Sequence, residues 1–292
     1  MLEDFKNAFN KPNNGLAQLI IINVAIYFVL LLLYMVLWGN ESIFEAVYKQ
    51  FSIPPVLTEF LKRPWTLVSY MFTHSMLDIF HILFNMLFLY WFGKLFVEYL
   101  GSDKLIALYV LGGIIGGACF LLLHYLAPDF VGDRGMVGAS GAIYAIVVAT
   151  AVLLPDYTFY LLLLGPVKIK YIAAFYVVLS LISLRQGINI GGNIAHLGGA
   201  LIGFVYIKQM QVGVNWGGWI TSTLSWIKGL LSPRRTVKVT YRKEAPPKKS
   251  TGAGTLGVSQ QEIDAILDKI SEGGYESLSK EEREKLFKAS KK

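Results

Sequence analysis

The sequence predicts an all-α polytopic membrane protein with six transmembrane helices. Of its 292 residues, 54% are hydrophobic, and the mean hydropathy is +0.50. Only 16% are charged, whereas soluble domains carry roughly 25% charged residues. Several apolar runs reach or approach the ~20 residues that cross a bilayer as a helix. Short segments with basic residues, Gly or Pro separate these runs, so the composition excludes an ordinary soluble domain.

Six apolar runs are expected to span the membrane. They lie at about 15–38, 80–100, 104–126, 138–154, 169–185 and 194–211. The first run is too long for a signal peptide and has no small-residue cleavage site, so we expect it to stay as an uncleaved span. The apolar stretch 156–168 is broken by Gly165 and Pro166. We expect it to be a connection that dips into the membrane, because a full crossing needs more residues.

The remaining segments divide the chain further. Residues 39–79 mix aromatic and apolar residues with isolated charges, which predicts a long interfacial first loop to a core that covers residues 1–211. Residues 212–232 contain three tryptophans and few charges and predict an interfacial amphipathic helix. The basic, Pro-containing residues 233–257 predict a flexible linker.

Residues 258–292 predict a small cytoplasmic helical hairpin. Two capping boxes, Ser259 with Glu262 and Ser279 with Glu282, each mark the start of a helix. Whether this hairpin only improves solubility or docks a cytoplasmic partner stays open.

Basic residues predict the orientation and the location. The net charge is +7, and residues 233–250 hold seven Lys and Arg against one Glu. The positive-inside rule then places both termini in the cytoplasm, which six spans allow, and we expect a bacterial inner (plasma) membrane. Membrane orientation accounts for the charge, so the expected surroundings are the lipid bilayer and no nucleic acid partner. The single cysteine, Cys119, excludes an intramolecular disulfide.

Four polar side chains lie in the predicted spans at positions that require an explanation, because polar groups at membrane depth are costly. Ser140 lies in "GASG", His196 in "NIAHLGGALIG", and His81 and Asn85 lie four residues apart in "HILFN". Each has a packing interpretation, since small-residue faces let membrane helices approach closely. However, the second, fourth and sixth spans run in the same direction, and all four residues lie near the N-terminal ends of these spans. Their common depth favours chemistry over packing.

A serine and a histidine at one depth can form a catalytic dyad. The hydroxyl of Ser140 is a weak nucleophile until a base takes its proton, and the imidazole of His196 titrates in the useful range. Asp78, the nearest carboxylate, lies about one turn above His81, so a dyad is expected instead of a Ser-His-Asp triad. Tyr144, one turn after Ser140, is expected to stack on the ring of His196.

Hydrolysis of an amide also needs hydrogen-bond donors for the oxyanion that forms. Asn85 and His81 offer side-chain N–H groups, and the N–H of Ser140 is unpaired at a helix N-terminus. Three glycines are expected to leave room for backbone and substrate. They are Gly138, Gly141 and Gly199.

At these residues the chain resembles the rhomboid intramembrane serine proteases, of the bacterial type with a C-terminal cytoplasmic extension. The motifs are "HILFN", "GKLFVEYLG" (93–101), "GASG" and "AHLGG", and the match covers about residues 15–211. The resemblance implies a six-helix bundle, Ser140 as nucleophile, His196 as base, an oxyanion hole at Asn85 and His81, no cofactor and no metal.

The resemblance also implies a substrate class and an entry route. The substrates would be transmembrane segments of single-pass membrane proteins, which enter by lateral opening near the fifth helix. The loop "RQGINIGGN" follows that helix, and its residues Ile188 and Ile190 would cap the site. Where many members have a Trp-Arg pair in the first loop, this chain has Trp65 followed by Thr66, with Arg63 before it.

Two other functions are compatible with parts of the pattern. A catalytically inactive rhomboid-like protein would serve as a membrane-protein binder or chaperone, but here both residues of the dyad are present. A small transporter would place broken helices at the midplane. The sequence shows no inverted repeat, and its polar cluster lies near one surface. The protease is therefore the preferred hypothesis.

Overall fold

The structure, a computed structural model, describes residues 14–131, 135–161, 165–231 and 260–290. It divides into two compact units, Met1–Arg234 and Arg235–Lys292, and each is described here by itself. The predicted linker 233–257 and Ser259 lie outside the described residues.

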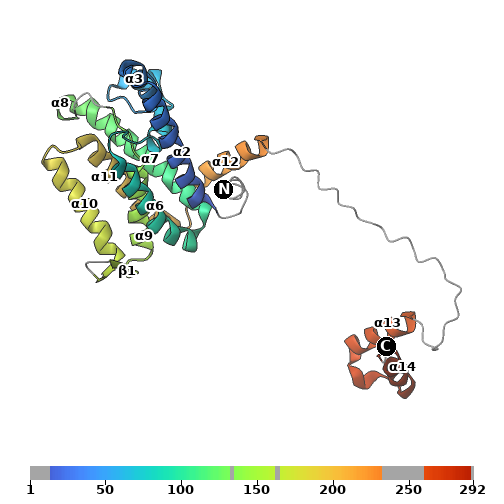
Figure 1. The fold of residues 1–292 in the computed structure, drawn as a ribbon. Helices are drawn as coiled ribbons and strands as arrows, with labels where there is room; N and C mark the ends of the chain where they lie inside the picture. Colours follow the sequence, from blue (N-terminus) through green and yellow to red (C-terminus); the bar gives the residue numbers. More distant parts are fainter. Residues whose placement is uncertain (1–13, 132–134, 162–164, 232–259, 291–292) are drawn as a thin grey trace. The chain divides into compact units, whose positions relative to one another are not determined.

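The structure confirms the predicted class of helical membrane protein, with six helices where the six spans were expected (Figure 1). They are α2 (Gly15–Val36), α6 (Ile79–Leu100), α7 (Ser102–Leu126), α9 (Ser140–Leu153), α10 (Ile169–Arg185) and α11 (Ile190–Gln211). Among the helices of the described ranges, α2, α6, α7 and α11 are long and apolar enough to cross a membrane. Helices α9 and α10 have only 14 and 17 residues, so the count of six crossings stays a prediction.

Helices α7, α9 and α11 form the centre of the bundle and approach one another through small residues. A Cβ atom on Gly199 or Gly203 of α11 would collide with the backbone oxygens of Gly141 and Ala145 of α9. Close backbone packing of this kind joins helices in lipid, where no hydrophobic force acts between them. Helix α10 lies at the edge of the bundle (Figure 1). Its buried residues are Ile169, Ala173 and Ser180.

The first loop contains the short helices α3 (Glu41–Tyr48), α4 (Leu57–Lys62) and α5 (Thr66–Ser69) and the 3-10 turn η1 (Tyr70–Phe72). Side chains tie it together even though the usual Trp-Arg pair is not adjacent in this chain. Arg63 donates from Nη1 to the carbonyl of Lys49 at 2.7 Å, and Trp65 donates from Nε1 to the carbonyl of Gln50 at 2.9 Å. One residue between Trp and Arg therefore still permits anchoring.

The connection from α7 to α9 contains a short helix and a bridge to the first loop. Ile53 and Met136 exchange two backbone hydrogen bonds at 3.0 and 2.9 Å. This bridge fastens the segment that precedes α9 to the first loop. The helix α8 (Pro128–Val131) follows α7.

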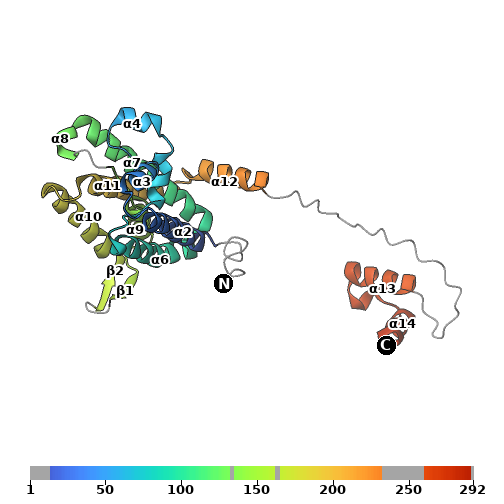
Figure 2. The same cartoon turned by 45° about the horizontal axis from the view of Figure 1, so that its top comes forward.

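The apolar stretch expected to dip into the membrane contains a β-hairpin. Strands β1 (Thr158–Leu161) and β2 (Gly165–Lys168) pair antiparallel, and residues 162–164 between them are outside the described residues. The hairpin extends away from the helices (Figure 2). Asp156 binds both Lys168 and Lys170 at 2.9 Å at its base. The strand pairing gives hydrogen-bond partners to backbone N–H and C=O groups that an irregular connection would leave unpaired.

Helix α12 (Gly218–Leu231) lies in the segment predicted to be interfacial. Trp219 and Trp226 lie seven residues apart on one exposed face, whereas Ile220 is buried. The start of α12 packs on α7 and α11, because a Cβ atom on Gly217 would contact Ala107 and Tyr206. Its place at a membrane surface stays a prediction.

The second unit has two helices, α13 (Gln260–Gly273) and α14 (Lys280–Ser290), joined through η2 (Tyr275–Ser277). The second capping box is confirmed. The N–H of Ser279 donates to Glu282 Oε2 at 2.7 Å, and the N–H of Glu282 donates to Ser279 Oγ at 3.3 Å. The predicted helix start at Ser279 is therefore correct.

Candidate active site

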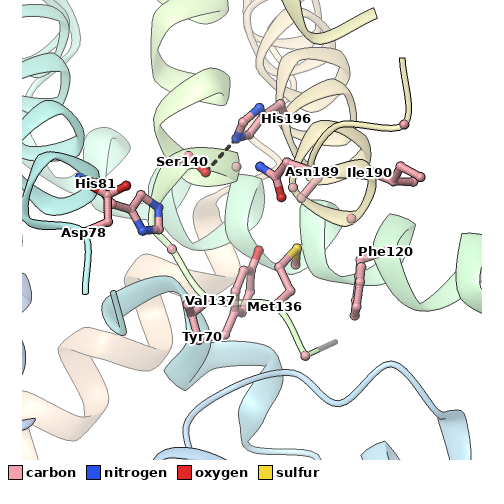
Figure 3. A pocket seen from close by; sticks show the side chains of 17 residues that line it. Tyr70, Asp78, His81, Phe120, Met136, Val137, Ser140, Asn189, Ile190 and His196 are labelled. Carbon is pink, nitrogen blue, oxygen red and sulfur yellow. Dashed lines mark hydrogen bonds between the residues drawn. The ribbon is translucent and has the colours of Figure 1, made fainter. Parts of the chain in front are cut away.

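The side chains of Ser140 and His196 meet between two helices. Ser140 is the first residue of α9, and His196 lies in the second turn of α11. The Oγ atom of Ser140 lies 2.7 Å from Nε2 of His196 (Figure 3). This distance allows direct proton transfer from the hydroxyl to the ring. The Gly199–Gly141 contact, about one turn further along α11, holds the two helices together at this level.

Two further side chains position the ring of His196. Tyr144 stacks on it with ring centroids 4.2 Å apart and an angle of 7° between the planes. Ser180 of α10 places its Oγ 3.3 Å from Nδ1 of His196 and 3.0 Å from the hydroxyl of Tyr144. The ring is therefore contacted at both nitrogens and on one face.

Sequence reasoning missed Ser180. Its only signal is a hydroxyl in an apolar run, and Ser183 in the same run has the same signal. The helical periodicity distinguishes the two serines. Ser180 lies on the same face of α10 as Ile169 and Ala173, and this face is buried. Ser180 is 1% exposed. Knowing which face of the helix is buried is thus what identifies this residue.

Ser140 lines two cavities. The larger cavity, of about 660 Å³, is also lined by His81, His196 and residues 187 and 189–192. The smaller, of about 370 Å³, lies between α6, α9 and α10 and is lined mainly by apolar and aromatic side chains. Ile190 lines the larger cavity, whereas Ile188 lines neither and is exposed. Only Ile190 thus occupies the place that the sequence suggested for both.

His81 lines the larger cavity, and its Nε2 atom lies next to Gly138, which lines the same cavity. The carboxylate of Asp78 is occupied as the N-cap of α6, where it accepts from the N–H groups of Phe80 and His81 at 3.1 and 3.3 Å. Nδ1 of His81 accepts a long hydrogen bond of 3.5 Å from the N–H of Ser75. The ring proton is therefore assigned to Nε2, where it is available as a donor.

Gly138 makes room for this ring. Its φ of +128° is unfavourable for residues with a side chain. A Cβ atom there would lie 2.9 Å from Nε2 of His81. The N–H of Gly138 donates to the carbonyl of Tyr70 at 3.0 Å, which holds the segment in place. Glycine is thus required at this position on two grounds.

Asn85, Gly141 and Gly199 differ in which cavity, if any, they line. Asn85 lines the smaller cavity beside Ser140, and its Nδ2 donates to the carbonyl of His81 at 2.6 Å. The amide has a second N–H that can face a ligand. Gly141 lines the larger cavity, but Gly199 lines neither and packs α11 on α9. The structure therefore gives Gly199 a packing position instead of a place in the site.

In the part of the chain that the structure describes, no three His, Cys, Asp or Glu side chains are grouped as metal ligands. The chemical capacity of the site lies in the hydroxyl, the imidazole and the surrounding N–H donors.

Comparison with known proteins identifies the family. Residues 61–210 match the Rhomboid domain. The chain belongs to the rhomboid family. Together with the apolar helices, this makes it an integral membrane protein. Residues 258–292 of this rhomboid match a second family, a family of unknown function (DUF6576).

Three curated relatives illustrate the similarity. RHOMBOID-like protein 12, mitochondrial, of Arabidopsis thaliana is 35% identical over 52% of this rhomboid and 48% of its own length. The human Presenilin-associated rhomboid-like protein, mitochondrial, is 26% identical over 70% and 52%. The Rhomboid protease GlpG of Haemophilus influenzae is 27% identical over 52% and 72%. The matches thus span about half the length of the plant and human relatives.

Proposed function

We propose that this rhomboid is an intramembrane serine endopeptidase that cleaves transmembrane segments of single-pass membrane proteins. The observation that carries the proposal is the 2.7 Å approach of Ser140 Oγ to His196 Nε2 in a cavity. The name of the Haemophilus influenzae relative, a rhomboid protease, supports the same reaction class.

The reaction would proceed through an acyl-enzyme. Ser140 Oγ attacks the carbonyl carbon of the scissile peptide bond while Nε2 of His196 takes the hydroxyl proton. When the tetrahedral intermediate collapses, the C–N bond breaks and His196 returns that proton to the leaving amine. A water molecule, deprotonated by His196, then attacks the ester and releases the carboxylate product and free Ser140.

The oxyanion would be stabilised by N–H groups around Ser140. The N–H of Ser140 lies in the first turn of α9, where backbone donors have no partner in the helix and the dipole favours negative charge. His81 and Asn85 of α6 each line a cavity together with Ser140. The donors that they offer are the Nε2–H of His81 and the second amide N–H of Asn85. We therefore expect Asn85→Ala to lower kcat by up to about 10²–10³-fold, with a smaller effect on KM.

The location and orientation belong to the same proposal. We propose a bacterial inner membrane, with the N-terminus and the residues after α11 on the cytoplasmic side. The concentration of Lys and Arg in residues 233–250 supports the orientation. The support for a bacterial membrane is the similarity to the relative of Haemophilus influenzae. Protease treatment of sealed vesicles of known orientation tests it. Cleavage of the C-terminal segment only from the side opposite the cytoplasm would refute it.

The decisive experiment combines a transmembrane substrate in liposomes with a serine-reactive fluorophosphonate. The reagent forms an O–P bond with Ser140, loses fluoride, and needs the hydroxyl proton removed by His196. We expect Ser140→Ala and His196→Ala to lose both cleavage and labelling while remaining folded. His124→Ala is the matched control, because His124 lines neither cavity. Unchanged cleavage by Ser140→Ala would overturn the proposal.

A further inference from the structure

Hydrogen bonds link the ring of His196, the hydroxyls of Ser180 and Tyr144, and a backbone carbonyl of α10. Ser180 Oγ lies 3.3 Å from His196 Nδ1 and 3.0 Å from the hydroxyl of Tyr144. The hydroxyl of Tyr144 in turn donates to the carbonyl oxygen of Tyr176 at 3.3 Å. A carbonyl can only accept, so the direction of every hydrogen bond in this series is determined from its far end.

The count of protons assigns the tautomer of the histidine. The single proton of Tyr144 is used on the carbonyl of Tyr176, so the oxygen of Tyr144 accepts from Ser180. The single proton of Ser180 is then used on Tyr144, so its oxygen is available to His196 only as an acceptor. His196 must therefore carry its proton on Nδ1.

We infer that Ser180 is a positioning residue that holds His196 in the tautomer with a free electron pair on Nε2. This inference rests on the proposed function, because Nε2 faces the hydroxyl of Ser140 at 2.7 Å. In the opposite tautomer Nε2 would carry the proton and could not accept another from Ser140. A neutral hydroxyl here selects the tautomer, a task that a carboxylate performs in a Ser-His-Asp triad.

The same contacts tie the base to the position of α10. Both Ser180 and the carbonyl of Tyr176 belong to α10, and only three residues of that helix are buried. A hydrogen bond of 3.3 Å is lost after a displacement of less than about 1 Å. The base is therefore correctly protonated only while α10 stays in place. Substrate entry beside α10 must leave Ser180 within reach of His196.

Nitrogen NMR of the full chain in detergent tests the assignment directly. The chain has only four histidines, so ¹⁵N-histidine labelling gives few signals, and His196→Ala identifies the one that matters. At neutral pH we expect the signal of His196 to show a protonated Nδ1 and an unprotonated Nε2. Ser180→Ala removes the acceptor, and Tyr144→Phe frees the Ser180 proton to donate. Both should populate the opposite tautomer, whereas Ser183→Ala on the same helix should not.

Kinetics supply an independent readout. We expect Ser180→Ala to lower kcat for a transmembrane substrate and the labelling rate of Ser140 by about tenfold, the effect of one hydrogen bond, with KM unchanged. Ser180→Thr keeps the hydroxyl and should restore most of the rate. A melting curve within a few degrees of wild type shows that Ser180→Ala is folded.

The outcomes separate the two proposals. A wild-type His196 protonated on Nε2, or a tautomer unchanged in Ser180→Ala, would overturn the role of Ser180. A wild type that shows the Nδ1–H tautomer but is never labelled by the fluorophosphonate would refute the proposed protease and leave the tautomer assignment intact.

Discussion

The substitution Gly199→Ala adds a single methyl group at the contact between α9 and α11. The new Cβ atom would overlap the carbonyl oxygen of Gly141, the residue directly after Ser140. A backbone oxygen cannot rotate away as a flexible side chain can. The helices must instead separate by on the order of 1 Å before the two atoms reach an ordinary van der Waals distance.

Two effects of different size follow from that separation. Overpacking a close contact costs about 1–3 kcal/mol of folding free energy, which the bundle should survive. The effect on catalysis should be larger, because Ser140 and His196 lie on the two helices that move apart. A misplacement of about 1 Å can cost on the order of 10²-fold in rate. We therefore expect a folded protein with a labelling rate and a cleavage rate about 10²-fold below wild type.

Fluorophosphonate labelling of Ser140, cleavage of a transmembrane substrate in liposomes and thermal denaturation in detergent measure these effects. Gly229→Ala in α12 is the control, because a Cβ atom there meets nothing within 4 Å. If Gly199→Ala keeps both rates within twofold of wild type, the α9–α11 contact does not set the geometry of the dyad, and the reasoning is refuted.

Three further predictions concern stability. Burial lowers the pKa of His74 to about 3, so the unfolded chain, with a pKa of about 6.5, binds the proton first. Stability should fall as the pH drops from about 6.5 towards 3, and melting curves of His74→Phe should lack this component. A hydrogen bond from Lys269 lowers the pKa of Glu282 to about 2. Its stabilisation of α14 should be present above pH 4.5 and lost towards pH 2. A carboxyl ¹³C titration midpoint above 4 would contradict this. Finally, Asn23 donates to Tyr109 in the core at 3.1 Å. Asn23→Ala should lower the free energy of unfolding by about 1–2 kcal/mol without changing the labelling of Ser140. Slower labelling would contradict this prediction and show that the contact between Asn23 and Tyr109 affects the active site.

The helices were predictable because their signal is local. A run of apolar residues such as 15–38 has to pass through lipid as a helix whatever its neighbours are, since its backbone groups find no other partners there. The structure begins and ends most of these helices within two residues of the expected bounds, and α11 begins four residues earlier. The hairpin 158–168 was not predicted, because its pairing joins residues across a segment whose composition also suits an irregular connection.

Ser140 and His196 were also found from sequence, but for a different reason. Polar residues are rare in membrane helices, so these two residues were conspicuous. The direction of each span gives the depth of a residue from its position in that span, and on this basis two residues distant in sequence were placed at one level. Depth does not determine which way a side chain faces. Asp78 shows this, since it is close in depth but is used as the cap of α6.

The sequence by itself thus determined the membrane class, the helix positions and the residues capable of chemistry, because hydropathy and residue type act along the chain. Only the tertiary structure decided which of these residues touch. The rotation of α10 selects Ser180 over Ser183 as the partner of His196, and the approach of α11 to α9 gives Gly199 its packing position. Both depend on contacts between helices that are remote in sequence, and no local sequence pattern predicts such contacts.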